Sequence, residues 1–221
     1  MRKSLFMLLL LALAAPASAQ IFIGPNIGPA YARTADAELR YFPKNEDWIS
    51  FAVSGGYTFN GPMYFPRKQA ECLSGFRNGG WHVRLGARNS FTVDRADNHL
   101  FWGLDLIYSR QKESAVFHTC AEATQNPERM EQELEIMSAA INIGYTWNPL
   151  KGKTIYQVFL VDFGLRVGYP FWSSAPLLGE RTYISGLGFT WFPIRSIAVE
   201  PVAIIRWKLW NNRYGFKKGK T

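Results

Sequence analysis

The fold class is decided by residues 137–147, which read MSAAINIGYTW. Apolar side chains occupy every second position, whereas the positions between them carry Ser138, Ala140, Asn142, Gly144 and Thr146. Successive side chains of a β-strand point to opposite faces, so this pattern predicts a strand with one apolar face and one small, polar face. The same alternation recurs in residues 81–88 and 197–209.

Extended over the whole chain, the alternation predicts eight strands. They lie at residues 31–42, 49–60, 81–93, 99–110, 135–147, 155–169, 182–193 and 197–210, and turn-forming residues separate many of them. Strands of this length match tilted membrane-spanning strands and exceed the ~5–6 residues usual in soluble proteins. We therefore predict an all-β fold, an antiparallel up-and-down transmembrane β-barrel of about eight strands.

The composition of the two faces predicts which of them points outward. A soluble barrel would carry many Lys, Glu and Gln on its polar face, but this face is rich in small residues such as Ser54, Gly56, Gly86 and Gly164. Aromatic residues concentrate toward strand ends, as in the aromatic belts of membrane proteins. The expected belts are Trp48, Trp147 and Trp191 near the short turns, and Trp81, Trp172, Trp207 and Trp210 near the opposite end. The apolar face is therefore expected to face lipid.

Composition and charge exclude two other classes of protein. The 221 residues are 48% hydrophobic and 15% aromatic, which excludes a disordered chain. Much of the net charge of +8 comes from Arg2 and Lys3 at the start and from Lys217, Lys218 and Lys220 at the end. A nucleic-acid-binding protein carries its charge as a patch on the fold, so no nucleic-acid partner is expected.

Residues 1–19 have the features of a signal peptide. Two basic residues precede an apolar run over residues 5–14, and Ala17-Ser18-Ala19 supplies the small residues of a cleavage site. The predicted organisation is a signal peptide at 1–19, a β-barrel domain at 20–216 and a basic tail at 217–221.

With its alternating strands, its aromatic strand ends and segments such as SGGYTF (54–59) and NIGYTW (142–147), the chain resembles the small OmpA/OmpX-type outer-membrane β-barrels of Gram-negative bacteria. The resemblance implies a location in the outer membrane of a Gram-negative bacterium, in contact with membrane lipid and lipopolysaccharide. It does not transfer a function, because this fold serves anchors, adhesins, enzymes and narrow channels.

One feature departs from that family, whose long loops follow odd-numbered strands. Here the long connections, residues 61–80, 111–134 and 170–181, follow the second, fourth and sixth predicted strands. An additional strand at residues 21–27 would restore the expected sides, although Gly24 and Pro25 disfavour regular pairing.

Charged residues on the small, polar face are expected to form a network in the lumen. They are Arg84, Arg88, Asp105, Asp162, Arg166, Glu200 and Arg206, with Asp36, Glu38 and Arg40 on the first predicted strand. Both signs occur in comparable number, which favours mutual pairing over an ion path or a catalytic carboxylate. A hairpin turn centred between Ala96 and Asp97 would place Arg88 directly opposite Asp105.

Two cysteines, Cys72 and Cys120, lie in connections that leave the barrel on the same side. In an exported protein this arrangement favours a disulfide between them, and two free thiols or a link to another chain are the alternatives. With three histidines and no CxxC pattern, the sequence predicts neither a metal site nor a cofactor.

The sequence favours a non-enzymatic barrel. His82, His99 and His118 all lack the His-X-Ser-Asn context of the barrel deacylases that act on lipid A. The expected task is envelope integrity, surface contact or limited permeation by a monomer. A lipid-A-modifying barrel enzyme and a soluble lipocalin-like carrier are the alternatives, and the acidic connection at residues 111–134 could bind cations or a basic surface partner.

Overall fold

The computed structural model describes residues 20–43, 48–62, 73–93, 98–117, 128–149, 159–177, 183–190 and 197–211. In chain order these form β1 (Gln20–Asn26), the 3-10 helix η1 (Gly28–Ala32), β2 (Thr34–Phe42), β3 (Ile49–Pro62), β4 (Leu73–Thr92), β5 (His99–Phe117), β6 (Glu128–Trp147), β7 (Phe159–Ser173), β8 (Tyr183–Ile184), β9 (Gly188–Thr190) and β10 (Ala198–Asn211). The predicted signal peptide, Cys72, Cys120 and the basic tail lie outside the described residues.

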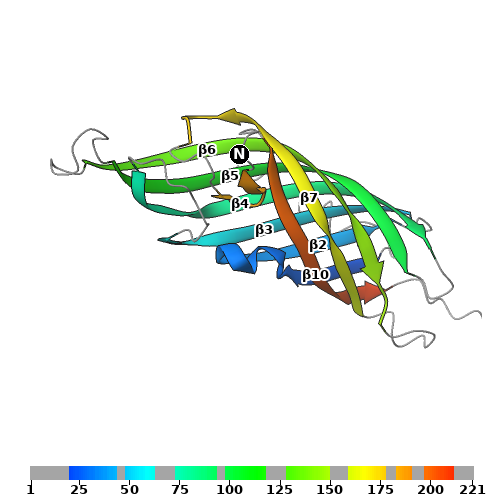
Figure 1. The fold of residues 1–221 in the computed structure, drawn as a ribbon. Coiled ribbons are helices and arrows are strands. Elements are labelled where there is room, and N and C mark those ends of the chain that lie inside the picture. Colours follow the sequence, from blue (N-terminus) through cyan, green and yellow to red (C-terminus); the bar gives the residue numbers. More distant parts are fainter. Residues whose placement is uncertain are drawn as a thin grey trace, which may run out of the picture.

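The strands form a closed antiparallel barrel, as the sequence predicts (Figure 1). Among the described residues, eight strands make its wall in the order β1 to β7 and then β10, and β10 pairs with β1 to close it. The turn side of the barrel carries the connections 43–48, 93–98 and 148–158. The loop side carries η1 and the connections 63–72, 118–127 and 174–197.

Side-chain burial shows that the apolar face points outward and the polar face inward. On β4, Trp81, Val83 and Leu85 are exposed, whereas His82 and Arg84 are buried. Every other strand of the wall alternates in the same sense over most of its length. The expected orientation of the two faces is therefore confirmed.

No helix in the described part of the chain has the length and apolarity needed to cross a bilayer.

Exposed tryptophans mark two aromatic belts. Trp48, Trp147 and Trp207 lie near the turn side, and Trp81 and Trp172 lie near the loop side; each is at least 40% exposed. The prediction placed Trp207 in the wrong belt, because β10 runs from the loop side to the turn side. Trp191 and the side chain of Trp210 are outside the described part.

The eight-strand count is confirmed, but its membership is corrected. Residues 182–193, predicted to be a wall strand, instead contain the short strands β8 and β9, which form a hairpin lying within the outline of the barrel in Figure 1. The hairpin turns because Gly186 and Gly188 adopt positive φ angles of 79° and 114°, which an extended strand does not allow. Leu187 N–H donates to the carbonyl oxygen of Ile184 across this turn at 3.0 Å.

The missing wall strand is β1, so the alternative of an additional strand at residues 21–27 is correct. Ile23 pairs with Leu39 of β2 on one side and with Trp207 of β10 on the other. Gly24 lies so close to β10 that a Cβ atom would collide with the carbonyl oxygen of Ile205. In the sequence Gly24 disfavours a strand, but in the structure a glycine is required there, because β1 and β10 approach each other closely where they close the barrel. With β1 counted, the long connections follow odd-numbered wall strands.

Three strands continue seven or eight residues further on the loop side than the sequence predicts. β4 starts at Leu73, β5 ends at Phe117 and β6 starts at Glu128, so half of the predicted connection at 61–80 and most of that at 111–134 is strand. The last pair between β6 and β7 is Ile136 with Ser173. Residues 73–80, 110–117 and 128–135 form the part of the sheet called here the β4–β6 extension, and β3 borders only its base, through the pairs of Gly61 with Asn78 and Pro62 with Arg77.

We predict that Gly24→Ala weakens closure of the barrel, because the added Cβ would separate β1 from β10. Heat-modifiable electrophoretic mobility should show a lower unfolding temperature for this variant than for wild type. Gly55→Ala is the matched control, since a Cβ at Gly55 would meet only the carbonyl oxygen of His82, at 3.4 Å. Equal unfolding temperatures for the two variants would contradict the assigned seam.

Candidate functional site

The lumen is filled by charged side chains in two clusters. Glu38, Arg40, Arg88, Asp162 and Arg206 form the turn-side cluster. Asp36, Arg84, Asp105, Arg166 and Glu200 form the loop-side cluster. All ten residues are at most 7% exposed. Each lies on the inward face of a wall strand, where alternation with apolar outward residues places it.

Asp162 of β7 is the centre of the turn-side cluster. Its carboxylate accepts hydrogen bonds from the guanidinium groups of Arg88 and Arg206 and from Thr146 Oγ1, the last at 2.7 Å. Arg206 also lies 3.2 Å from Glu38 Oε1, and Arg40 Nε donates to that same oxygen at 2.8 Å. The cluster thereby connects strands on opposite sides of the barrel.

Two ion-paired arginines organise the loop-side cluster. Arg84 Nη2 donates to Asp36 Oδ2 at 2.7 Å, and Arg84 Nη1 lies 3.9 Å from Glu200 Oε2. Arg166 donates to Asp105 Oδ2 at 2.9 Å and also pairs with Glu200. Glu200 thus pairs with both arginines, and these contacts link β4, β7 and β10.

Charge is balanced across the two clusters but not within each. Three arginines face two carboxylates in the turn-side cluster, and two arginines face three carboxylates in the loop-side cluster. The sum is five positive and five negative groups. A buried charge without a partner costs several kcal/mol, so this equality is what a filled, narrow lumen requires.

The predicted direct opposition of Arg88 and Asp105 is wrong by two residues. Arg88 pairs with Gly103, and Asp105 pairs with Gly86. A shift of two residues keeps every side chain on its face, so alternation cannot detect it. Arg88 instead meets Asp162, and Asp105 meets Arg166, so both partners are on β7.

The β8–β9 hairpin seals the lumen on the loop side. Tyr183 Oη donates to Glu200 Oε1 at 2.9 Å, and Arg84 Nη1 donates to the carbonyl oxygen of Gly186 at 3.2 Å. Asn78 Nδ2 donates to the Tyr183 carbonyl oxygen. The hairpin is therefore bonded directly to the loop-side cluster.

The other side of the hairpin is apolar. Ile184 and Leu187 are 0% exposed and pack against Leu134 and Ile136 of β6 and Ile107 of β5. β9 also continues the pairing along the edge of β10. The ladder between β1 and β10 ends at Ile204 of β10. Further along β10, Ala198 and Val199 pair with Thr190 and Phe189 of β9. The hairpin thus fills the lumen and covers a strand edge that β1 leaves.

One group of residues has the composition of a serine hydrolase triad. His82 Nδ1 lies 3.1 Å from Ser185 Oγ, and His82 Nε2 lies 3.5 Å from Asp36 Oδ1. However, His82 and Ser185 are each 1% exposed, and Ser185 Oγ shares a hydrogen bond with Thr58. Asp36 also binds Arg84 and Asn26. A nucleophile needs room for a substrate, so we interpret this group as a link between the hairpin and the wall.

The sequence predicts no contact between His82 and Ser185 and no lumen position for Tyr183, because the alternation over residues 182–193 indicates a wall strand. The signal that could have revealed the hairpin is Gly186-Leu187-Gly188, since two glycines inside a predicted strand weaken it and favour a bend. Among the described residues, no group of three or more His, Cys, Asp or Glu side chains is placed to hold a metal ion.

Closed antiparallel pairing, an apolar outer wall between two aromatic belts and a filled lumen define a small transmembrane β-barrel of the outer-membrane type. Membrane-spanning barrels with an even number of antiparallel strands are typical of bacterial outer-membrane proteins.

Comparisons with known proteins add two similar folds. Neisserial surface protein A (NspA) aligns over 86% of this chain and 93% of its own, with 11% identity and a TM-score of 0.41. Ail, the attachment invasion locus protein of Yersinia pestis, aligns over 86% and 96%, with 13% identity and a TM-score of 0.39. No family model and no curated protein sequence matches the chain significantly. The assignment to the barrel class therefore rests on the strand pairing and burial described above.

We predict that Asp162→Ala destabilises the barrel by about 3–5 kcal/mol, because it leaves Arg88 and Arg206 buried without their shared partner. Urea unfolding in detergent micelles measures the effect. Glu133→Ala is the control, since it removes an exposed partner of Arg110 at 2.9 Å and should leave stability unchanged. Equal losses in the two variants would show that the turn-side cluster contributes no special stability.

Proposed function

We propose that the protein is a closed, non-enzymatic barrel that anchors the β4–β6 extension at the cell surface for contact with other molecules. Two parts of the structure support this proposal: a lumen filled by paired charges and sealed by a hairpin, and three strands that continue past the loop-side aromatic belt.

The filled lumen argues against permeation as the main task. An eight-stranded barrel has an interior just wide enough for side chains. Here that space holds ten charged groups of balanced sign, and Tyr183 to Leu187 add a further layer on the loop side. An ion path would need charges left free to bind a passing ion, whereas these charges bind one another.

The β4–β6 extension carries the features of a solvent-exposed surface. On β5 the outward residues change from Leu106 and Tyr108 to Arg110 and Lys112 as the strand passes the loop-side belt. Lys112 Nζ lies 3.2 Å from Glu131 Oε2, and its hydrogen bond lowers the pKa of that carboxyl below the ordinary value. Charges of this kind belong in water, so the extension stands outside the membrane.

Two acidic residues of this region, Glu131 and Glu133, are engaged by neighbouring cations. Glu133 pairs with Arg110 at 2.9 Å, and Glu131 pairs with Arg129 at 2.7 Å as well as with Lys112. Those carboxylates are therefore less available to a metal cation than the sequence suggests. A partner that contacts alternating charges of both signs fits the extension better.

The proposed disulfide would tie this extension. Cys72 and Cys120 lie outside the described residues, but Leu73 and Phe117, which border their segments, pair directly in the ladder between β4 and β5. The two segments thus leave adjacent strands at the same end. A bond between the cysteines would hold the tips of β4 and the β5–β6 connection together.

We predict that the purified protein in a planar lipid bilayer gives no stepwise single-channel currents. The reason is the paired charge in both clusters and the seal formed by β8 and β9. A known open porin in the same bilayers serves as the positive control. Reproducible current steps from the wild-type protein would favour permeation as the function.

We also predict that an epitope tag inserted in the 118–127 connection is bound by antibody on intact cells. The same tag in the 150–158 connection, on the turn side, should be bound only after permeabilisation. This pair of insertions tests the display of the extension. Antibody access to the turn-side tag alone would reverse the orientation and defeat the proposed surface contact.

A further inference from the structure

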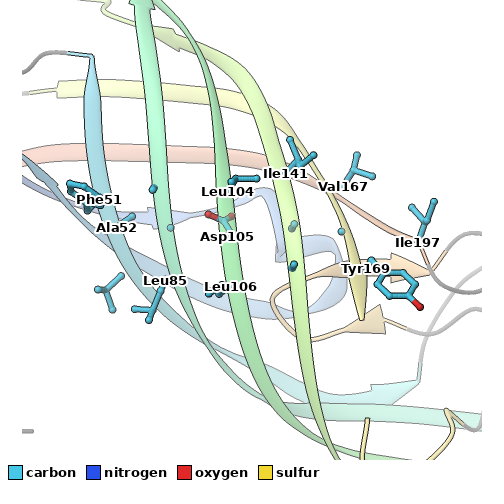
Figure 2. Close-up of a pocket in the computed structure, with 16 residues that line it drawn as sticks. Phe51, Ala52, Leu85, Leu104, Asp105, Leu106, Ile141, Val167, Tyr169 and Ile197 are labelled. Atoms are coloured by element: carbon cyan, nitrogen blue, oxygen red, sulfur yellow. The ribbon is translucent and has the colours of Figure 1, made fainter. Parts of the chain in front are cut away.

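The outer wall of the barrel is hollowed into an apolar groove of about 900 Å³ across β3 to β7. Figure 2 shows its labelled residues spread over neighbouring strands, from Phe51 at one end to Tyr169 and Ile197 at the other. Exposed side chains such as Leu85, Leu106 and Ile141 form its sides.

Strand register explains the hollow. Two rows of outward residues cross the five strands side by side, and each contains one alanine among larger side chains. The rows are Phe51, Ala87, Leu104, Ile141 and Val167, and then Val53, Leu85, Leu106, Ala139 and Tyr169. At the two alanines only a methyl group projects from the outer face of the sheet. The larger side chains beside them project further, and they form the rims of a groove.

The depth of the groove along the barrel shows which part of the bilayer it faces. On β5, the groove residues Leu104 and Leu106 lie between the outward residues Trp102 and Tyr108. The groove is thus inside the apolar band and opens toward the hydrocarbon region of the bilayer. Its occupant must be apolar and must be present at that depth.

Shape and charge narrow the choice of occupant. A second copy whose two-fold axis passes through the groove would place this hollow against the same hollow, which leaves a void. Lipid A carries phosphate groups that call for cations, but the outward cations Arg110, Lys112 and Arg129 already pair with Glu131 or Glu133. A single flexible hydrocarbon chain can follow an oblique groove and fill it.

We propose that this groove, lined by Phe51, Leu85, Leu106, Ile141 and Tyr169 with Ala87 and Ala139 at its floor, holds an acyl chain of a bilayer phospholipid in a preferred position. Within a membrane such a preference comes from van der Waals packing, because lipid tails are as apolar as the protein wall. The groove therefore orders a chain without a headgroup site. The inference goes beyond surface contact and does not depend on it.

The experiment uses full-length protein in vesicles of phosphatidylethanolamine and phosphatidylglycerol that contain a phospholipid with a photoactivatable diazirine in one acyl chain. After irradiation, mass spectrometry of peptides maps the adducts. In wild type we expect adducts on the groove strands β4 to β6 severalfold above those on β2, whose Leu39 is exposed in the same band.

Filling the groove with Ala87→Leu and Ala139→Leu should abolish this enrichment. Ala35→Leu with Ala37→Leu is the matched control, because both alanines are outward-facing on β2 and outside the groove. Heat-modifiable mobility verifies folding of each variant, and Ala139→Val alone, which should reduce the enrichment, serves if the double variant does not fold.

Three results would overturn the proposal. They are uniform adducts around the wild-type barrel, enrichment that survives filling of the groove, and loss of the enrichment when lipopolysaccharide is added, which would identify lipid A as the occupant. Cross-links between two copies of the chain at the groove would likewise show that protein covers it.

Discussion

Closure of the sheet by β1 and β10 is the constraint on which the rest of this structure depends. In a bilayer each unpaired backbone group costs several kcal/mol, so a membrane-spanning sheet must leave no free edge within the hydrocarbon. β1 meets this requirement with seven residues, pairing with β2 on one side and β10 on the other. Where β1 ends at Asn26, the seam continues through β9, which pairs with Ala198 and Val199.

A barrel closed with eight strands then dictates what its interior can contain. The lumen admits side chains but little else. Charged residues at inward positions must therefore find partners across the lumen. Asp162 on β7 does so with Arg88 on β4 and Arg206 on β10, and these contacts fix the distances between opposite walls as well as satisfying charge. Tyr183 of the β8–β9 hairpin donates a hydrogen bond to Glu200, so the hairpin that seals the lumen is held by one of the paired charges.

Features that follow from alternation could be predicted from the sequence, and features that depend on distance between segments could not. Fold class and the outward apolar face follow from period-two patterning, and so does the inward direction of residues such as Arg84 and Glu200. The number of wall strands agrees because residues 182–193, counted as a wall strand, are replaced by β1. The partner of each charge does not, because a two-residue shift of register preserves the faces, as Arg88 and Asp105 show. Residues 182–193 look like a strand locally, and only the positive φ angles of Gly186 and Gly188 turn them inward. Because residues 182–193 are not a wall strand, β10 runs in the direction opposite to the predicted one. Trp207 therefore lies in the turn-side belt and not in the loop-side belt.

The division between inside and outside also determines where this protein can meet other molecules. Inward positions are committed to packing and charge pairing, so Ser185, His82 and Asp36 act within the fold despite their chemical types. Outward positions respond only to the medium that they face. Along β5 the change from Leu104 and Leu106 to Arg110 and Lys112 marks the passage from lipid to water on one continuous strand. This barrel can therefore contact other molecules on two outer surfaces, the charged β4–β6 extension and the apolar wall. The same paired strands, β4 to β6, run through both surfaces.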